Sequence, residues 1–471
     1  MHQDFDREVL SRLPLAEATL LLWQFVCDDS SLHDLYDRHR GRTYHKKIPF
    51  PLMAQLVRDA LLEPEGSGHK SFCQAQQDGI LPAVLSSTYD KLGHLPPAVS
   101  EAFLAEGADR LRQVFPDTQA ATLDDPIAPS LLDVEILVVD GKVVKRVPHR
   151  LQPARQRKGG LLGGKGLVAL HLRSGLALAL ATDPDVEAND AKLISDLLPQ
   201  VRGRLPGPRL WLADRQFCDL IQTAAFVAEE GDHFLVRYHS KVHFYPDPAR
   251  PSQQGPDRQG RVYEQEWGWL GGERDKRRRY VRRVTLHRDG QEDVILVTDL
   301  LDAGSYPAEE LLALYLARWG IERVFQQITE VFHLNRLIAT TPQGTLFQLS
   351  FCLLLYNMIQ VVRGYVAVGQ GYSLEVISTE LLFVDVTKQL VALHELVAVG
   401  RVVELLPAAC SAAAVRQRLR GLLGGRWSDS WIKAPARTRK PAAAKQGKRD
   451  HTSVYRLLKA HRQAETKGAV T

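Results

Sequence analysis

Three carboxylates in this chain stand where acidic side chains could meet around divalent cations. Asp140 follows the apolar run 134–139, and Asp214 follows the apolar run 210–213. Glu322 lies further along, within a stretch of helical periodicity. Carboxylate oxygens are the hard ligands that magnesium takes in proteins, and two such ions about 4 Å apart can activate the attacking oxygen and stabilise the leaving oxygen of a phosphodiester. The three acids together predict metal-dependent phosphodiester chemistry.

Each acid taken alone has a plainer interpretation. An Asp-Gly pair between two apolar runs, as at Asp140 and Gly141, is typical of a hairpin turn. Asp214 alone is typical of a loop or a helix cap. Glu322 alone is typical of an exposed ion-pair partner of Arg318, one helical turn earlier. The metal-site hypothesis therefore depends on the ends of two strands and one helix converging on a single point.

The helix around Glu322 carries two further polar side chains with the same orientation. A single helix is predicted from Ala308 to about Phe332, and Tyr315, Arg318 and Glu322 fall on one face of it at 100° per residue. A tyrosine, a guanidinium and a carboxylate on one stripe suit a surface where the carboxylate holds a metal and its neighbours hold a phosphate backbone.

The elements around the acids predict an α/β fold with a mixed sheet. Strands in hairpin order are expected between 134 and 181, and helices alternate with strands from 188 to 237, an order that resembles a ribonuclease H-like core. Six ranges are predicted: a helical N-terminal domain, which the family resemblance described below makes a DNA-binding domain, the first part of the core, a β-rich insertion, the completion of the core with the Glu322 helix, a helical C-terminal region and a basic disordered tail. These ranges are 1–115, 126–237, 238–300, 301–375, 376–432 and 433–471, respectively.

Composition excludes several classes of protein. Among the 471 residues, 45% are hydrophobic and 24% are charged, which rules out collagen-like, wholly disordered and disulfide-scaffold chains. The five cysteines form no CxxC pair, so neither a zinc ribbon nor a redox dithiol is expected. An odd number of isolated thiols is typical of a protein in a reducing cytoplasm. The apolar run 346–362 contains Gln348, Asn357 and Gln360, and predicts a buried core helix rather than a membrane span. No signal peptide and no membrane partner are expected.

Charge is unevenly distributed along the chain. Residues 433–471 hold eleven Lys and Arg against Asp450 and Glu465, a net charge of +9, so the rest of the chain carries −4 of the total of +5. A second basic cluster, 274–283, includes three consecutive arginines. Basic patches on a near-neutral body indicate a polyanion partner, whereas the plainer interpretation is a solvated tail and a solvated turn. The consecutive arginines are Arg277, Arg278 and Arg279.

A glycine-rich run at 159–166 has most of a phosphate-binding loop pattern. Gly166 stands where that loop needs a serine or threonine, and the run leads into a strand instead of a helix. We interpret it as a flexible connector between strands.

These motifs resemble the DDE transposases of cut-and-paste bacterial insertion sequences, in the YREK group of the insertion-sequence-four family. The resemblance covers roughly residues 80–370. Its most specific part is Tyr315-x2-Arg318-x3-Glu322, and its two Asp motifs count only in combination with it. Those motifs are Val-Val-Asp-Gly at 138–141 and Ala-Asp-Arg-Gln-Phe at 213–217.

The resemblance implies a role for each residue of the motifs. Asp140, Asp214 and Glu322 would bind two Mg²⁺ ions, with Mn²⁺ as a substitute. Tyr315 and Arg318 would contact the transposon end. Metal-activated water would cut the DNA, and the freed 3′ hydroxyl would attack the other strand or the target, so no covalent protein–DNA intermediate is needed.

The resemblance also implies partners. These are double-stranded DNA with terminal inverted repeats, target DNA and a second copy of the chain, in the nucleoid of a bacterial cytoplasm. The helical N-terminus would help to recognise the repeats, and the basic stretch 274–283 would hold phosphates. In the β-rich insertion, Trp267 and Trp269 are candidates for stacking on a flipped base, with core packing as the alternative.

One position departs from the family pattern. Thr329 stands where the family has a lysine that is thought to touch DNA near the cut, and Arg323 or Arg336 would have to substitute for it. This departure favours an alternative function, an inactive or domesticated transposase that binds DNA without cutting it. The retention of all three acids favours the enzyme, and a metal-dependent nuclease without joining activity is the other alternative.

Overall fold

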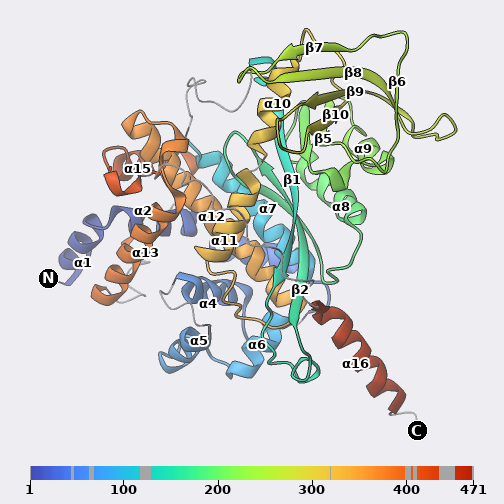
Figure 1. Cartoon of the computed structure of the whole chain (residues 1–471). Helices are drawn as coiled ribbons and strands as arrows, with labels where there is room; N and C mark the ends of the chain where they lie inside the picture. Colours follow the sequence, from blue (N-terminus) through green and yellow to red (C-terminus); the bar gives the residue numbers. More distant parts are fainter. Residues whose placement is uncertain are drawn as a thin grey trace.

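The computed structural model describes residues 2–43, 47–62, 68–116, 129–318, 320–397, 405–406, 411–433 and 451–468. A large mixed sheet lies against a thick layer of helices, and its β-rich end extends beyond that layer, at the top of Figure 1. The predicted α/β architecture, with a large mixed sheet and helices at both ends of the chain, is confirmed.

The sheet has eleven strands in the order β11-β2-β1-β4-β5-β10-β9-β8-β6, with β3 beside β2 and β7 beside β8. The first five strands in the chain are β1 (Glu135–Lys145), β2 (Gly160–His171), β3 (Ala177–Asp183), β4 (Arg209–Ala213) and β5 (Asp232–Arg237). The others are β6 (Phe244–Pro246), β7 (Gln253–Pro256), β8 (Val262–Leu270), β9 (Arg279–Leu286), β10 (Val294–Thr298) and β11 (His451–Ser453).

Strand directions divide the sheet into two parts. β2 runs antiparallel to both β1 and β3, whereas β1, β4 and β5 run parallel to one another. β10 pairs antiparallel with β5, so the β-rich segment predicted at 238–300 extends the central sheet instead of forming a separate one. Through this pairing the β-rich segment belongs to the same sheet as the strands that carry the acids.

Alternating side chains of the central strands enter two different cores. Val138 and Leu212 belong to the core shared with the long helix α12 (Pro342–Gln370). Val139 and Ala213 belong to the core on the opposite face, which α8 (Asp190–Arg202) helps to cover. Because side chains alternate along a strand, residues 140 and 214 are in phase with Val138 and Leu212, on the α12 side.

The helical layer is built around α12. The buried core helix predicted at 346–362 is confirmed, because α12 is long and apolar enough to cross a membrane but its most apolar window lies entirely inside the fold. Six N-terminal helices precede α7 (Pro97–Val114), and they are α1 (His2–Ser11), α2 (Pro14–Val26), α3 (Asp29–His39), α4 (Phe50–Leu62), α5 (Gly68–Gln77) and α6 (Leu85–Gly93). The other α-helices of the described residues are α9 (Leu220–Phe226), α10 (Ala308–Ala317), α11 (Gly320–Glu330), α13 (Thr379–Leu396), α15 (Ala412–Leu423) and α16 (Val454–Gly468).

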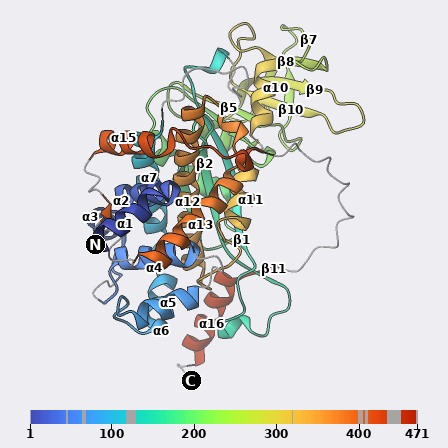
Figure 2. The same cartoon turned by 90° about the vertical axis from the view of Figure 1, so that its left-hand side faces the viewer.

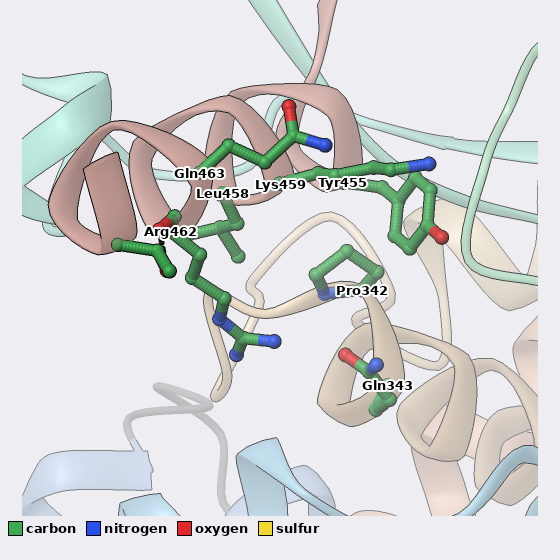
Figure 3. A pocket seen from close by; sticks show the side chains of 8 residues that line it. Pro342, Gln343, Tyr455, Leu458, Lys459, Arg462 and Gln463 are labelled. Atoms are coloured by element: carbon green, nitrogen blue, oxygen red, sulfur yellow. Dashed lines mark hydrogen bonds between the residues drawn. The ribbon is translucent and has the colours of Figure 1, made fainter. Parts of the chain in front are cut away.

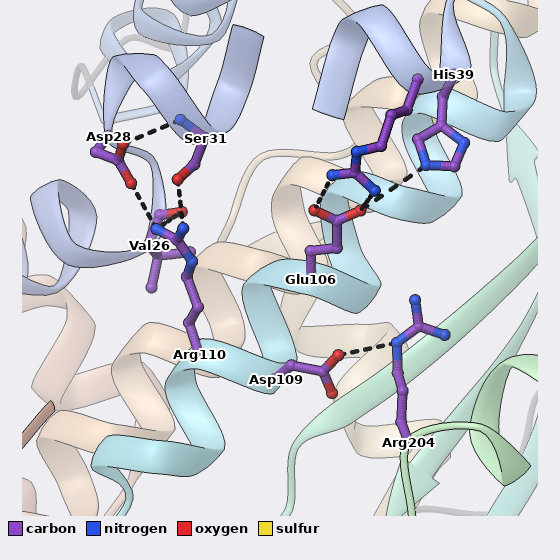
Figure 4. Close-up of polar contacts among 9 residues, drawn as sticks. Val26, Asp28, Ser31, His39, Glu106, Asp109, Arg110 and Arg204 are labelled. Atoms are coloured by element: carbon purple, nitrogen blue, oxygen red, sulfur yellow. Dashed lines mark hydrogen bonds and ion pairs between the residues drawn. The ribbon is translucent and has the colours of Figure 1, made fainter. Parts of the chain in front are cut away.

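Helix α7 ties the N-terminal helices to the sheet. Arg110 donates to the backbone oxygen of Phe25 at 2.8 Å and to Asp28 at 2.5 Å. The preceding residue, Asp109, accepts from Arg204, which follows α8, at 2.9 Å (Figure 4). The helices of 1–115 therefore share contacts with both layers, and the domain boundaries given above remain predictions.

The glycine-rich run predicted as a flexible connector is part of β2, so that expectation is wrong. A Cβ added at Gly163 would lie 2.6 Å from Thr345 Oγ1, and one at Gly164 would lie 2.9 Å from Leu346. Glycine is therefore required here because α12 packs directly on the backbone of β2. The run serves packing between a strand and a helix.

The C-terminal segment also differs from its prediction as a disordered tail. Residues 434–450 lie outside the described residues, but β11 pairs in parallel with β2 and α16 follows it directly. Val454 and Leu457 are buried at the base of α16. Figure 2 shows β11 and α16 at the lower end of the molecule.

Candidate active site

The pairing of β1 with β4 brings the two aspartates together. The strands are parallel with Val139 opposite Ala213, so the next residues, Asp140 and Asp214, lie side by side. Both follow the phase of the residues that face α12. Side chains that are 74 positions apart in the chain therefore emerge at adjacent points of one sheet surface.

Asp140 does not end its strand, so the hairpin interpretation of Asp140-Gly141 is wrong. β1 continues to Lys145, and Asp140 and Gly141 pair with Val168 and Leu167 of β2. Sheet pairing on this side overrides the local turn preference. On the other side β4 ends at Ala213, and Asp214 follows it as the N-cap of the 3-10 turn Arg215–Phe217.

The predicted single helix from 308 to 332 is interrupted at Arg318. α10 ends at Ala317 and α11 begins at Gly320, with i to i−3 bonds from Arg318 N–H to Tyr315 O (3.1 Å) and from Ile321 N–H to Arg318 O (3.1 Å). Such bonds tighten the turn, and Gly320 is a poor helix former. After this break α11 lies against β1, where Lys142 contacts Phe325 and Thr329.

Arg318 lies between the aspartate pair and Glu322. Its two terminal nitrogens are each 3.8 Å from a carboxylate oxygen, Asp140 Oδ2 on one side and Glu322 Oε1 on the other. The side chain of Arg318 is 5% exposed, whereas that of Glu322 is 46% exposed. Glu322 therefore lies at the exposed side of the site, and the guanidinium of Arg318 separates it from Asp140.

The electrostatics of Asp140 reflect this crowding. Burial raises the pKa of its carboxyl to about 6, against the lowering effects of the Gly141 N–H and Arg318. The charges of Asp214 and Glu322 raise that pKa further. The three acids therefore interact as like charges, and a divalent cation would relieve that repulsion.

Tyr315 lies deeper, under the aspartates. Only 3% of it is exposed, burial raises the pKa of its phenol to about 12, and its hydroxyl is 3.5 Å from the carbonyl oxygen of Ala213. Arg318 is also buried. The structure thus brings both predicted DNA-contacting residues to the site, beneath its surface, and their contact with a transposon end stays a prediction.

The donor set suits a hard divalent cation. Oδ1 of Asp140 accepts from Gly141 N–H at 2.8 Å and Oδ1 of Asp214 accepts from Arg215 N–H at 2.7 Å, which fixes the orientation of both carboxylates. Across the described ranges, no three acidic, His or Cys side chains are already arranged around one ion position. Arg318, at 3.8 Å from two of the acids, supplies the positive charge between them.

Lys142 is a residue of the site that sequence reasoning missed. Its ammonium donates to Thr329 Oγ1 at 2.8 Å and to the carbonyl oxygen of Phe325 at 3.3 Å. Among the described residues, no carboxylate forms an ion pair with it, and burial lowers its pKa. The signal was its position two residues after Asp140, which places both side chains on one face of β1.

A second basic edge flanks Asp214. Glu292, in the turn between β9 and β10, lies 3.0 Å from Arg237 of β5 and 4.0 Å from Arg215. Arg237 also lowers the pKa of Tyr315. The β-rich segment therefore reaches the neighbourhood of the acids through this turn.

The basic cluster 274–283 divides into exposed and buried members. Arg277 is exposed, Arg278 and Arg279 are half-buried, and the guanidinium of Arg278 lies 4.2 Å from the centre of the Trp269 ring. Arg282 is fully buried, where it donates to Gln265 and to the Tyr306 carbonyl, so the expectation that it holds phosphate is wrong.

The two tryptophans have different environments. Trp267 is fully buried, and its indole N–H donates to the Leu301 carbonyl at 2.8 Å, so it is a core residue and not a base-stacking one. Trp269 is half-buried beside Tyr280, with ring centres 5.0 Å apart. It stays a candidate for base stacking.

Comparison with known proteins agrees with this site. Residues 133–358 match the family described as "Transposase DDE domain", and this range contains all three acids. No curated protein matches the sequence. A solved structure, the cryo-EM structure of a piggyBac transposase synaptic complex with hairpin DNA, is 13% identical, with a TM-score of 0.35 over 88% of this chain and 78% of that one. Residues 133–358, which hold all three acids, are therefore similar to the transposase DDE domain.

Proposed function

We propose that this protein is a cut-and-paste DNA transposase that cleaves and joins strands at transposon ends. The observation that carries the proposal is the β1–β4 register, which sets Asp140 beside Asp214, with Glu322 held across Arg318. The strand order β3-β2-β1-β4-β5, with β2 antiparallel to its neighbours, supports a ribonuclease H-like core.

The residues divide the work as follows. Asp140, Asp214 and Glu322 would hold two Mg²⁺ ions, or Mn²⁺ in their place. When bound, the ions would activate the attacking oxygen and stabilise the leaving one. Arg318 lies between two of the carboxylates, and its positive charge favours their ionised form.

Lys142 supplies a cation next to Thr329, the position at which the insertion-sequence resemblance places a lysine. Lys142 lies on β1, and its ammonium donates to two neutral oxygens of α11, Thr329 Oγ1 and the Phe325 carbonyl. The third N–H of the ammonium is left to donate to a ligand. A phosphate of the cut strand would supply the missing counter-charge. This arrangement favours an active enzyme over a decayed one despite Thr329.

The test is nicking of a DNA fragment that carries the inverted repeats flanking the reading frame. We expect Mg²⁺- or Mn²⁺-dependent nicking that is lost on chelation and in Asp214→Ala, but retained in Asp196→Ala, which removes an exposed acid of α8. Pre-cut ends should then join to a target.

Each alternative predicts a different result. DNA binding without nicking in any metal would support a domesticated binding protein and overturn the enzyme. Nicking without joining of pre-cut ends would support a plain nuclease. Assembly on two ends is expected to involve two copies of the chain, measurable by light scattering of the complex.

A further inference from the structure

A groove of about 590 Å³ lies between α16 and the start of α12, away from the acids. One wall is a single face of α16 and the other is the first turn of α12 (Figure 3). The side chains along it are Tyr455, Leu458, Lys459, Arg462, Gln463 and Thr466 from α16, with Pro342 and Gln343 opposite.

The base of α16 is fixed to the sheet. Ser453 of β11 pairs with Leu162 of β2, and Val454 is buried directly after it. Arg456 pairs with Asp185 at 3.4 Å and with Glu187 at 2.5 Å. The helix then projects away from the body of the protein, at the lower right of Figure 1. Its groove-lining face is thus held by anchors that lie outside the groove.

The groove is electropositive and rich in hydrogen-bond donors. Lys459 and Arg462 form no ion pair with any carboxylate of the described residues, and no acidic side chain lines the groove. Glu465, the one acid of α16, pairs with His461 at 3.3 Å. Figure 3 shows the guanidinium of Arg462 extending from α16 toward the α12 side of the gap.

The opposite wall adds to this character. Thr341 caps α12 by accepting from Gly344 N–H, and Pro342 and Gln343 form its first turn. The N-terminal end of a helix carries partial positive charge.

We propose that this groove binds the phosphate backbone of DNA without reading its sequence. Two unpaired cations, amide and hydroxyl donors and a helix N-terminus are the groups that contact phosphates. The proposal rests on DNA as the substrate and adds a second contact region, separate from the acids, for the flank of the bound duplex.

The distance along the sheet suits one duplex reaching both places. Asp140 and Lys145 are five residues apart on β1, about 17 Å at the rise of a strand. Lys145 pairs with Leu162, which in turn pairs with Ser453 at the base of α16. A duplex at the acids would reach α16 within about one helical turn, about 34 Å.

The experiment measures the salt dependence of duplex binding by the full chain, using fluorescence anisotropy. The double variant Lys459→Gln/Arg462→Gln should lower the slope of log K against log salt by about two units, because each lost phosphate contact removes about 0.9. Gln343→Glu, which places a negative charge on the other wall, should weaken binding without altering α16. The matched control, Arg420→Gln/Arg426→Gln, removes two exposed cations at α15 and beyond.

An unchanged salt slope in the α16 double variant, or an equal decrease of the slope in the control, would overturn the proposal that the groove binds DNA. If an acidic polypeptide binds wild type and is lost in both groove variants while DNA binding is unaffected, the occupant is a protein and the proposal is wrong. Metal-dependent nicking by the wild-type chain is scored separately. Its absence would overturn the transposase function and leave the salt-slope result to stand on its own.

Discussion

Lys142 of β1 and Thr329 of α11 are joined by a 2.8 Å hydrogen bond, although 187 positions separate them in the chain. The bond connects the strand of Asp140 to the helix of Glu322 and holds the ammonium against that helix. The bond therefore brings a lysine side chain from β1 to position 329, where the family pattern has a lysine and this chain has a threonine.

Exchanging the two residues tests what the ammonium does. Lys142→Thr should lower the rate of nicking roughly 10- to 100-fold, because a hydrogen bond to a charged group contributes about 1.5–3 kcal/mol. Lys142→Thr/Thr329→Lys, which returns the charge from the helix side, should recover most of that loss. Lys145→Thr, at an exposed position of the same strand, is the control. No recovery in the exchanged variant would mean that Lys142 acts only by packing α11 against β1.

Asp140→Asn tests how much the buried carboxylate of Asp140 destabilises the folded protein. The pKa of Asp140 in the folded protein, about 6, lies above its ordinary value, so the folded state binds the proton more tightly than the unfolded state. Stability therefore falls as pH rises from about 4 to about 6, and this cost is fully present above that range. The asparagine variant, which cannot ionise, should be more stable than wild type at pH 7 by roughly 1–3 kcal/mol, and equal to it near pH 4.

Urea unfolding at several pH values, without metal, measures this difference. Asp196→Asn, at an exposed position, should show no such pH-dependent gain. Added Mg²⁺ should stabilise wild type and not Asp140→Asn. A variant that is less stable than wild type at pH 7 would show that Asp140 contributes more through its bond to Gly141 than it costs through burial.

Sequence could predict the acids because their strands are buried on both faces. Such strands appear as continuous apolar runs, and β4 (Arg209–Ala213) contains the whole apolar run 210–213. The buried helix α12 was predictable for a similar reason, since its polar residues are too few for a surface helix.

Other features depend on contacts that no local pattern contains. The turn preference of Asp140-Gly141 is overridden by pairing with β2, whose partner residues, Val168 and Leu167, come much later in the chain. β11 forms only because an edge of β2 is available to it. The partner of Lys142 follows from how α11 crosses β1, and that crossing depends on the break after Arg318.

Gly164→Ala tests the close approach of α12 to β2. The added methyl group would lie 2.9–3.0 Å from three side-chain atoms of Leu346, so one of the two elements must shift. Overpacking of this kind costs about 1–3 kcal/mol. Urea unfolding should show that loss, whereas Gly272→Ala, with nothing within 4 Å of the added atom, should be nearly neutral. Equal stability of both variants would mean that the strand and the helix can separate here without cost.

Arg318 should set the pH above which Asp140 is ionised and able to bind a metal ion. Its charge lowers the pKa of Asp140, so Arg318→Met should raise that pKa further above 6 and shift the acidic limb of the nicking profile to higher pH. Arg318→Lys keeps the positive charge but loses the planar fork that reaches both carboxylates. We therefore expect the lysine variant to keep the limb near its wild-type position while nicking more slowly at every pH. An identical limb in all three proteins would show that Arg318 orients the carboxylates without tuning their ionisation, since a loss of geometry alone lowers the rate without moving the profile.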